Sequence, residues 1–232
     1  MTARRFDDFD VHAGNYRDIH SANVKMSGAD SYYFAEHKVK LLQEFEENKK
    51  LRFLDLGCGD GTTEGFVNTI FPAFTIEAID ISAESIAIAE KKPIRQTHFT
   101  IYDGSTIPFE DNYFDIVFVA SVLHHINFEH HPGILKEIHR VLKPGGRLYL
   151  FEHNPINPVT RYFVKTCIFD KDARLLDYSY SKKLLHDTAF RNIERKFILF
   201  FPRNGILSKL LKWEDKLGWL PLGGQYLFRA IK

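Results

Sequence analysis

The chain has little cysteine, no long apolar run and no excess of charge of either sign. Its 232 residues include only two cysteines, Cys58 and Cys167, too few for a disulfide scaffold and typical of a reducing compartment. No uncharged apolar run approaches the roughly 18–20 residues that span a bilayer, and the opening MTARRFDDFD lacks the apolar core of a signal peptide. We therefore expect a cytoplasmic protein.

The balance of charge argues against nucleic acid as a partner. Lysine and arginine number 31 against 30 aspartates and glutamates, so the formal net charge is +1 and no global field attracts a polyanion. With 44% hydrophobic and 26% charged residues, the composition is that of a globular domain. The 21 phenylalanines predict a core packed largely with aromatic rings.

Apolar segments alternate with helical patterns at intervals typical of βαβ units. We predict strands over residues 51–56, 75–81, 97–102, 116–120, 147–152, 192–201 and 225–232. Helices are predicted over residues 62–70, 82–91 and 132–141, and around residues 208–217. This alternation predicts an α/β fold with an open, doubly wound, mostly parallel sheet and helices on both faces.

The residues before the first predicted strand have no place in this sheet. Residues 31–45 have the pattern of a helix, and a further arm covers residues 6–20. We expect residues 1–45 to form an N-terminal helical lid over a bound ligand, and residues 46–232 to form the core domain. A permanently docked helix is the alternative. Tyr16 and His20 lie in this arm, Tyr16 as a candidate ligand contact.

The strongest chemical signal is a glycine-rich loop at the end of the first predicted strand. The sequence LDLGCGDG, residues 54–61, places Gly57, Gly59 and Gly61 within five positions. Doubly wound sheets bind ligands beyond the carboxyl ends of their strands, where glycine lets the backbone come close to the ligand. A tight turn without a ligand is the alternative.

Spacing and charge distinguish between two kinds of cofactor for this loop. A dinucleotide favours the spacing G-x-G-x-x-G and a pyrophosphate at the helix N-terminus. The loop instead reads G-x-G-x-G and is flanked by Asp55 and Asp60. Carboxylates repel a pyrophosphate but attract the ammonium and sulfonium groups of S-adenosylmethionine, which has no phosphate. The charge therefore favours S-adenosylmethionine.

Several motifs in register between residues 51 and 150 resemble those of class I S-adenosylmethionine-dependent methyltransferases. They are DLGCG at residues 55–59, EAIDIS at 77–82, YDGSTIPFED at 102–111, DIVFVASVLHHI at 115–126 and KPGGR at 143–147. The resemblance implies the Rossmann-like methyltransferase fold, with seven strands of which the last is inserted antiparallel.

The resemblance also implies which residues hold the cofactor and its product S-adenosylhomocysteine. Asp80 matches the acidic residue that accepts both ribose hydroxyls, and Asp103 matches the one near the adenine amino group, with Ile81 and Ile107 packing on the ring. A helix cap is the alternative for Asp80, and a turn is the alternative for Asp103. The full set of expected contacts is Tyr16, Asp55, Gly57, Cys58, Gly59, Asp80, Ile81, Asp103, Gly104 and Ser121.

Histidines are concentrated between residues 124 and 139. Neighbouring His124 and His125 cannot easily ligate one ion together, and no carboxylate or thiol accompanies them at ligand spacing, so we predict no metal site. His130 and His131 are expected on the surface at the start of a helix.

Two histidines follow predicted strands and are therefore candidate catalytic residues. His125 comes after the fourth strand and His153 after the fifth, so both are expected to face the ligand crevice. Either could act as a general base or position the methyl acceptor. Packing contacts near the cofactor are the alternative.

The C-terminal third suggests the class of acceptor. The segments FEHNPINPVTRYFVKTCIFDKDARLL and QYLFRAIK are similar to a bacterial methyltransferase subgroup associated with surface polysaccharide or lipid-linked pathways. We therefore expect methyl transfer from S-adenosylmethionine to a small-molecule or lipid-linked acceptor. A catalytically idle methyltransferase-like binding subunit and an NAD-dependent oxidoreductase are the alternatives.

The predicted helix around residues 208–217 carries a basic stripe. Lys209, Lys212 and Lys216 lie beside apolar residues at helical spacing. The helix is expected either to pack on the sheet with a solvated basic edge or, together with Trp219, to rest on an anionic membrane.

Overall fold

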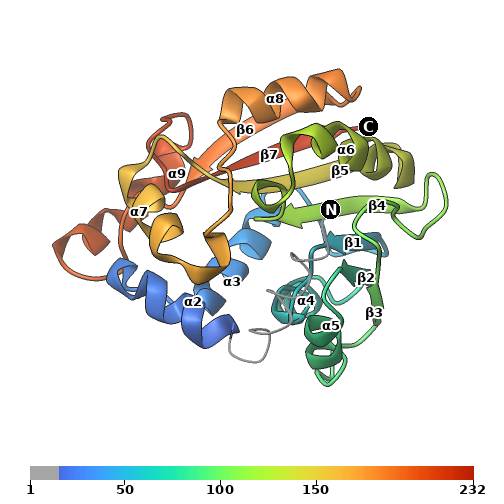
Figure 1. The fold of residues 1–232 in the computed structure, drawn as a ribbon, viewed down its shortest axis with the longest axis horizontal. Helices are drawn as coiled ribbons and strands as arrows, with labels where there is room; N and C mark the ends of the chain where they lie inside the picture. The colour runs from blue at the N-terminus through green and yellow to red at the C-terminus, as the bar shows by residue number, and fades with distance from the viewer. Residues whose placement is uncertain (1–15) are drawn as a thin grey trace.

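The structure, a computed structural model, describes the chain from residue 16 to residue 232, except for the side chains of residues 16–18, 20 and 26. A single sheet in the order β3-β2-β1-β4-β5-β7-β6 runs through it (Figure 1). Its strands are β1 (Arg52–Leu56), β2 (Thr75–Asp80), β3 (Thr97–Ile101), β4 (Phe114–Ala120), β5 (Leu142–His153), β6 (Arg191–Ile198) and β7 (Gln225–Ile231).

Strands β1 to β5 pair in parallel, whereas β7 lies between β5 and β6 and pairs antiparallel with both. The predicted doubly wound seven-stranded fold is confirmed, including the antiparallel last strand. Chain order reverses at β1, because β2 and β3 lie on one side of it and β4 and β5 on the other. Ligands of doubly wound sheets bind at such a reversal point.

Helices cover both faces of the sheet (Figure 1). The helices α3 (Ser31–Leu42), α4 (Thr62–Ile70) and α5 (Ala83–Ala89) lie on one face, and α6 (His131–Val141) and α8 (Tyr178–Asp187) lie on the other. Successive strand residues point to opposite faces, so Phe53 of β1 packs with α3 and α4 while Leu54 packs with α6. Because both faces are covered, the central strands are almost entirely apolar.

The N-terminal segment consists of α2 (Tyr16–Val24), the short helix η2 (Lys25–Ser27) and α3. Helix α3 follows the capping residue Asp30, whose side chain accepts the Tyr33 N–H, and it places Val39 and Leu42 in the core. Helix α2 contacts α7 (Pro158–Thr166), where Asn23 Nδ2 donates to the Phe163 carbonyl at 2.9 Å. The lid over residues 1–45 therefore remains a prediction, and residues 1–15 of it lie outside the described part of the chain.

The structure adds two helices that the sequence reading did not predict. Asn157 accepts the N–H groups of Val159 and Thr160 and starts α7, and Asp177 accepts the Ser179 N–H and starts α8. The predicted helix over 208–217 is instead the 3₁₀ segment η6 (Ile206–Trp213) followed by the single turn α9 (Glu214–Leu217). Three further 3₁₀ turns are η3 (Leu123–His125), η4 (Phe128–His130) and η5 (Ile168–Asp170). None of the helices in residues 16–232 combines the length and apolar character needed to cross a bilayer.

Candidate functional site

The loops that follow β1 and β4 approach each other closely at the reversal point. Gly57 has a φ of +83°, and a Cβ placed on it would lie 2.4 Å from Cγ2 of Val122. Only glycine tolerates both the conformation and the contact. Between these loops and the N-terminal helices lies a cavity of about 800 Å³. The predicted crevice at the carboxyl ends of the strands is therefore present.

One end of this cavity is acidic, with Asp55, Asp60 and Asp80 in its wall. Asp80 Oδ2 accepts the Gly59 N–H at 2.8 Å, and its Oδ1 accepts the Ser82 N–H at 2.9 Å, so the carboxylate holds the glycine loop in position. A Cβ on Gly59 would meet nothing within 4 Å. The loop thus presents backbone to open cavity, which leaves room for a ligand that the acidic wall attracts.

The other two carboxylates at this end have protein partners. Asp60 accepts hydrogen bonds from Thr62 Oγ1 at 2.9 Å and Lys92 Nζ at 3.0 Å. Asp55 lies beside the fully buried Glu64. Burial, together with the negative charge of Asp55, raises the pKa of Glu64 well above its ordinary value. The pair therefore favours a protonated Glu64 beneath the glycine loop.

Most of the residues expected to hold the cofactor line the cavity. Besides Asp55 and Asp80, the wall contains Gly57, Cys58, Gly59, Ile81 and Ser121. Asp103 and Gly104 are not in this wall, and Asp103 Oδ1 accepts the N–H groups of Ser105 and Thr106, both at 2.8 Å. Asp103 thus closes a turn, and its adenine contact remains a prediction.

The side chain of Tyr16 lies outside the described part of the chain, although its backbone begins α2. Lys38 of α3 and Tyr102, after β3, line the cavity, and the sequence reading missed both. Lys38 Nζ donates to Ser121 Oγ at 3.1 Å, across a separation of 83 residues that no motif spans.

The middle of the cavity holds a cluster of histidines and carboxylates. His124 Nδ1 lies 2.6 Å from Glu152 Oε2, and the Leu123 N–H donates to the other oxygen of Glu152. On its far side, His124 Nε2 lies 3.6 Å from Asp170 Oδ1, and His125 Nε2 lies 3.5 Å from the same oxygen. We call His124, His125, His153, Glu152 and Asp170 the histidine cluster. Four of its five members, all but Glu152, line the cavity.

The members of the histidine cluster differ in charge. Burial alone would lower the pKa of His124, but the adjacent carboxylates Glu152 and Asp170 raise it to about 9. Burial and the neighbouring charge on His124 lower the pKa of His153 to about 3, so its ring is neutral at neutral pH. His124 also lowers the pKa of both Glu152 and Asp170, despite the burial that opposes this shift.

Both predicted catalytic histidines, His125 and His153, face the cavity, and their roles remain predictions. Two expectations about this region are wrong. His131 is not on the surface; it is fully buried, and its Nε2 donates to the carbonyls of Leu123 and Ile126. A carboxylate does accompany the adjacent histidines, because η5 brings Asp170 to them from a distant part of the chain.

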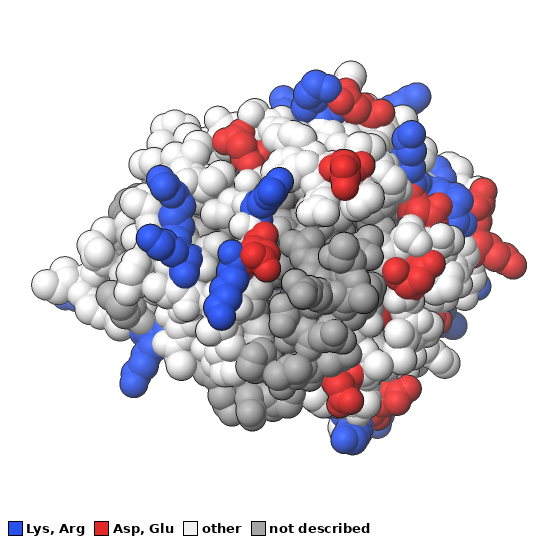
Figure 2. Space-filling model, in the orientation of Figure 1, with Lys and Arg blue, Asp and Glu red and all other residues white. Residues whose placement is uncertain are grey.

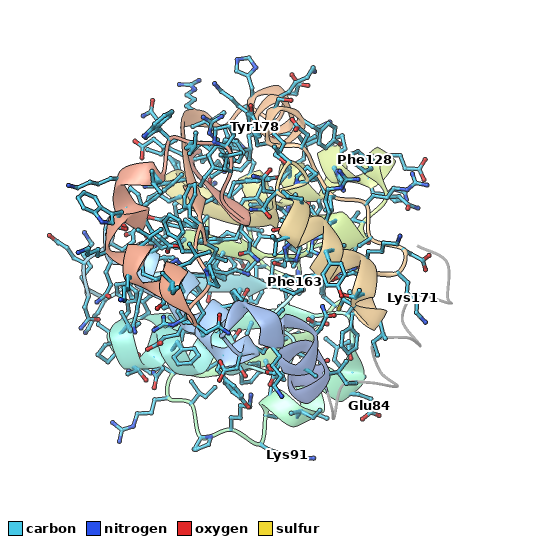
Figure 3. All side chains as sticks on the ribbon, turned by 90° about the vertical axis from the view of Figure 1, so that its left-hand side faces the viewer. Glu84, Lys91, Phe128, Phe163, Lys171 and Tyr178 are labelled. Carbon is cyan, nitrogen blue, oxygen red and sulfur yellow. The ribbon has the colours of Figure 1, made fainter. Side chains whose placement is uncertain are left out.

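The far end of the cavity is lined mainly by apolar side chains, with Asn23 and Arg203 among them. Figure 3 shows Phe163 of α7 in the region between that helix and the N-terminal helices. The apolar wall residues at this end are Val24, Phe163, Val164, Phe169, Phe200, Phe201, Pro202 and Leu207. Three residues of the same wall, Val159, Tyr162 and Leu207, leave 57%, 54% and 51% of their surfaces exposed. We call these three the apolar rim.

Two sequence comparisons find similarity to methyltransferases. Residues 54–150 match a family model described as a methyltransferase domain. A demethylmenaquinone methyltransferase of Chlorobaculum parvum is 32% identical over 188 residues, which are 80% of this chain and 73% of that protein. The chain spans only about half the length of two further relatives with the same name.

Solved structures of methyltransferases share the fold. A SAM-dependent methyltransferase of Thermotoga maritima has a TM-score of 0.70 at 19% identity, covering 98% of this chain and 99% of that one. Phosphoethanolamine N-methyltransferase 2 of Haemonchus contortus, in complex with phosphomonomethylethanolamine and S-adenosylhomocysteine, has a TM-score of 0.67 at 18% identity. That match covers 100% of this chain and 61% of that one.

Proposed function

The chain belongs to the class I S-adenosylmethionine-dependent methyltransferases, and on that premise we propose that it methylates a lipophilic, hydroxylated ring compound of the quinol type, taken up from a membrane surface. The family gives no support to an NAD-dependent oxidoreductase. The enzyme names of the relatives favour an active enzyme over an idle binding subunit.

The described residues fit S-adenosylmethionine, which supplies a methyl group activated by its sulfonium charge. Asp80 would accept the ribose hydroxyls, since its carboxylate offers two acceptor oxygens. Lys38 would pair with the carboxylate of the methionine part, and Asp55 would attract its ammonium group. The acidic end of the cavity thereby holds the cofactor and leaves the apolar end to the acceptor.

The observation that carries the proposal is the contrast between the two ends of one cavity. The acidic end suits a cationic cofactor, whereas the other end is apolar and continues onto the surface through the apolar rim. Large apolar side chains exposed around the mouth of a pocket are typical of sites that meet a lipid or another apolar partner. Further exposed apolar residues on the neighbouring segments are Ile156, Ile206, Leu210, Trp213 and Leu222.

Basic residues beside the apolar rim favour an anionic bilayer as the surface that it meets. Arg161 and Lys165 are exposed on α7, and Lys209 and Lys212 are exposed on η6. In Figure 2, lysine and arginine predominate on the α7 side of the visible face, and acidic groups are more frequent on the opposite side. Each basic residue near an anionic membrane contributes about 1 kcal/mol to the free energy of binding to that membrane. Together with partial insertion of the rim, this supports reversible docking.

The names of the relatives support the choice of a quinol. Demethylmenaquinone is a naphthoquinone with an isoprenoid tail, and its reduced form presents two ring hydroxyls. In the proposed complex, the ring would lie against the histidine cluster, and Gln225, whose Nε2 lies 3.3 Å from His153 Nδ1, would border it. The tail would follow the apolar wall towards the rim.

A series of acceptors tests this assignment. The ring is kept as a reduced naphthoquinone, and the tail is lengthened from none to one and then two isoprene units. Each unit adds five carbons, which contribute up to about 4 kcal/mol if fully buried. We expect kcat/KM to rise at least tenfold with the first unit. An equal kcat/KM for tailless and tailed acceptors would show that the apolar end does not bind the tail.

Docking is tested separately by sedimentation with vesicles. The protein should sediment with vesicles that contain an anionic lipid and much less with purely zwitterionic vesicles. Replacing Val159, Tyr162 and Leu207 together by serine should weaken binding about 100-fold or more, since each inserted apolar side chain contributes roughly 1 kcal/mol or more. Ile101, 53% exposed on β3, provides the matched control as Ile101→Ser. Equal binding by both variants would refute docking through the rim.

A further inference from the structure

We propose that His124, His125 and Asp170 bind a divalent transition-metal ion in the wall of the cavity. Each of the three residues offers one ligand atom, and these atoms all lie within 4.8 Å of one another. The two nitrogens are 3.6 and 3.5 Å from the Asp170 oxygen. These distances are longer than usual hydrogen bonds and also lie within the range of an ion pair. They are close to the roughly 3.4 Å between neighbouring ligand atoms around a tetrahedral ion with bonds of about 2.0–2.2 Å.

The surroundings of His124 match those of a metal-ligating histidine. Such a histidine usually directs its second ring nitrogen to a carboxylate, which fixes the orientation of the ring. His124 Nδ1 lies 2.6 Å from Glu152 Oε2, and Glu152 is fully buried and held by the Leu123 N–H. This contact leaves Nε2 of His124 directed towards Asp170.

The charge of the site also fits a divalent ion. Glu152 is fully buried, and the side chain of Asp170 is only 11% exposed, so the histidine cluster contains two carboxylates largely removed from water. A divalent ion that replaces the ring proton of His124 supplies the two positive charges that balance them. Imidazole and carboxylate ligands are those that zinc, manganese and ferrous ions accept.

The proposed site has an open coordination position. Three protein ligands leave a tetrahedral ion with one position for water or substrate, as in catalytic zinc sites. All three ligands line the cavity. In the role that we assign, an acceptor hydroxyl oxygen takes the open position as an oxyanion, and its proton leaves to solvent. This role rests on the proposed function, whereas the metal site itself does not.

Cobalt titration provides the test. The protein is purified without a histidine tag, treated with a chelator, and titrated with Co²⁺ while its visible absorption is recorded. We expect one equivalent of Co²⁺ to bind with a d–d absorption band, and Zn²⁺ to displace it. Asp170→Asn and His125→Ala each remove a ligand and should weaken binding by about 100-fold or more. Glu152→Gln removes the carboxylate that holds the proposed ligand His124 and should weaken Co²⁺ binding by about 10–100-fold.

Matched controls separate the site from adventitious binding and from misfolding. His130 is half-exposed and lies outside the histidine cluster, so His130→Ala should leave the Co²⁺ affinity unchanged. Calorimetry with S-adenosylhomocysteine reports the integrity of each variant at the other end of the cavity. Asp170→Asn preserves side-chain volume and keeps the test informative if His125→Ala does not fold.

The outcomes separate the metal site from the proposed function. The metal site is overturned if the wild-type protein binds no stoichiometric Co²⁺, or if Asp170→Asn binds it as tightly as wild type while still binding S-adenosylhomocysteine. Stoichiometric binding without methylation of any tested quinol supports the metal site and overturns the proposed function. Full activity of the chelator-treated enzyme on a quinol supports the function and overturns the catalytic role of the metal.

Discussion

Replacing Asp80 by asparagine tests how the acidic end of the cavity holds the cofactor. Each carboxylate oxygen of Asp80 already accepts one backbone N–H, from Gly59 at 2.8 Å and from Ser82 at 2.9 Å. In Asp80→Asn, the amide NH₂ group must face one of these N–H groups, donor against donor. The substitution therefore disturbs the glycine loop and also weakens the acceptor available to the ribose.

The expected loss of affinity follows from these contacts. Hydrogen bonds to a charged group contribute about 1.5–3 kcal/mol. Because about 1.4 kcal/mol corresponds to a factor of ten, the Kd for S-adenosylhomocysteine should rise roughly 10- to 150-fold. The melting temperature without ligand should also fall, since one backbone N–H loses its acceptor. Isothermal titration calorimetry and thermal unfolding measure the two effects separately.

Asp177→Asn is the matched control. Asp177 also accepts a backbone N–H, that of Ser179 at 2.8 Å, but it starts α8 and is not part of the cavity wall. Its substitution should leave the Kd for S-adenosylhomocysteine unchanged. If Asp80→Asn binds the ligand as tightly as wild type, Asp80 is a structural residue of the loop and the assignment of the ribose contact is wrong.

Three further predictions concern the same end of the cavity. The folded state binds the Glu64 proton more tightly than the unfolded state, so this contribution to stability is present below the ordinary pKa of 4.5 and is lost as the pH rises towards the raised pKa of Glu64. Glu64→Gln, which stays neutral, should therefore unfold at a higher temperature than wild type at pH 8. The melting temperature should rise by about 2–4 °C for each kcal/mol gained in the free energy of unfolding, and the gain should vanish near pH 4.5 in calorimetric scans. A constant gain at every pH would contradict this. Lys38→Gln should weaken the binding of S-adenosylhomocysteine about tenfold but leave the binding of 5′-methylthioadenosine, which lacks the amino-acid part, unchanged. Equal losses of affinity for the two ligands in calorimetry would place Lys38 elsewhere in the site. Gly57→Ala should destabilise the protein by about 1–3 kcal/mol, because it combines a positive φ with the Val122 contact. Gly59→Ala should lower stability less and ligand affinity more. If unfolding and binding experiments find Gly59→Ala the less stable variant and Gly57→Ala the weaker binder, the geometry of the loop is contradicted.

Local patterns explain why much of the fold and of the acidic end could be predicted. The apolar run of β4 indicates a strand covered on both faces, and the glycines after β1 indicate a backbone turn beside a ligand. The location of Asp80 in the cavity wall could be predicted from its position at the end of β2. Each of these signals lies within a few residues of the feature that it predicts.

The features that the sequence did not reveal depend on contacts between distant segments. Lys38 reaches Ser121 only because α3 packs beside the sheet, and Asp170 reaches His125 only because η5 folds back over the end of β4. His131 is polar and follows another histidine, so its burial depends on carbonyls of the preceding loop that accept its N–H. Helix α7 had a recognisable start in Asn157 and Pro158, but its short apolar pattern gave little periodicity.

The most direct test of the account is methyl transfer to a quinol held in a membrane. The protein is incubated with S-adenosylmethionine labelled in its methyl group and with anionic vesicles containing reduced demethylmenaquinone, and the lipids are then extracted. The account predicts label in the extracted quinone in the same molar amount as the S-adenosylhomocysteine that is formed. Label that enters only water-soluble acceptors, with the quinol left unmethylated in the vesicles, would contradict it.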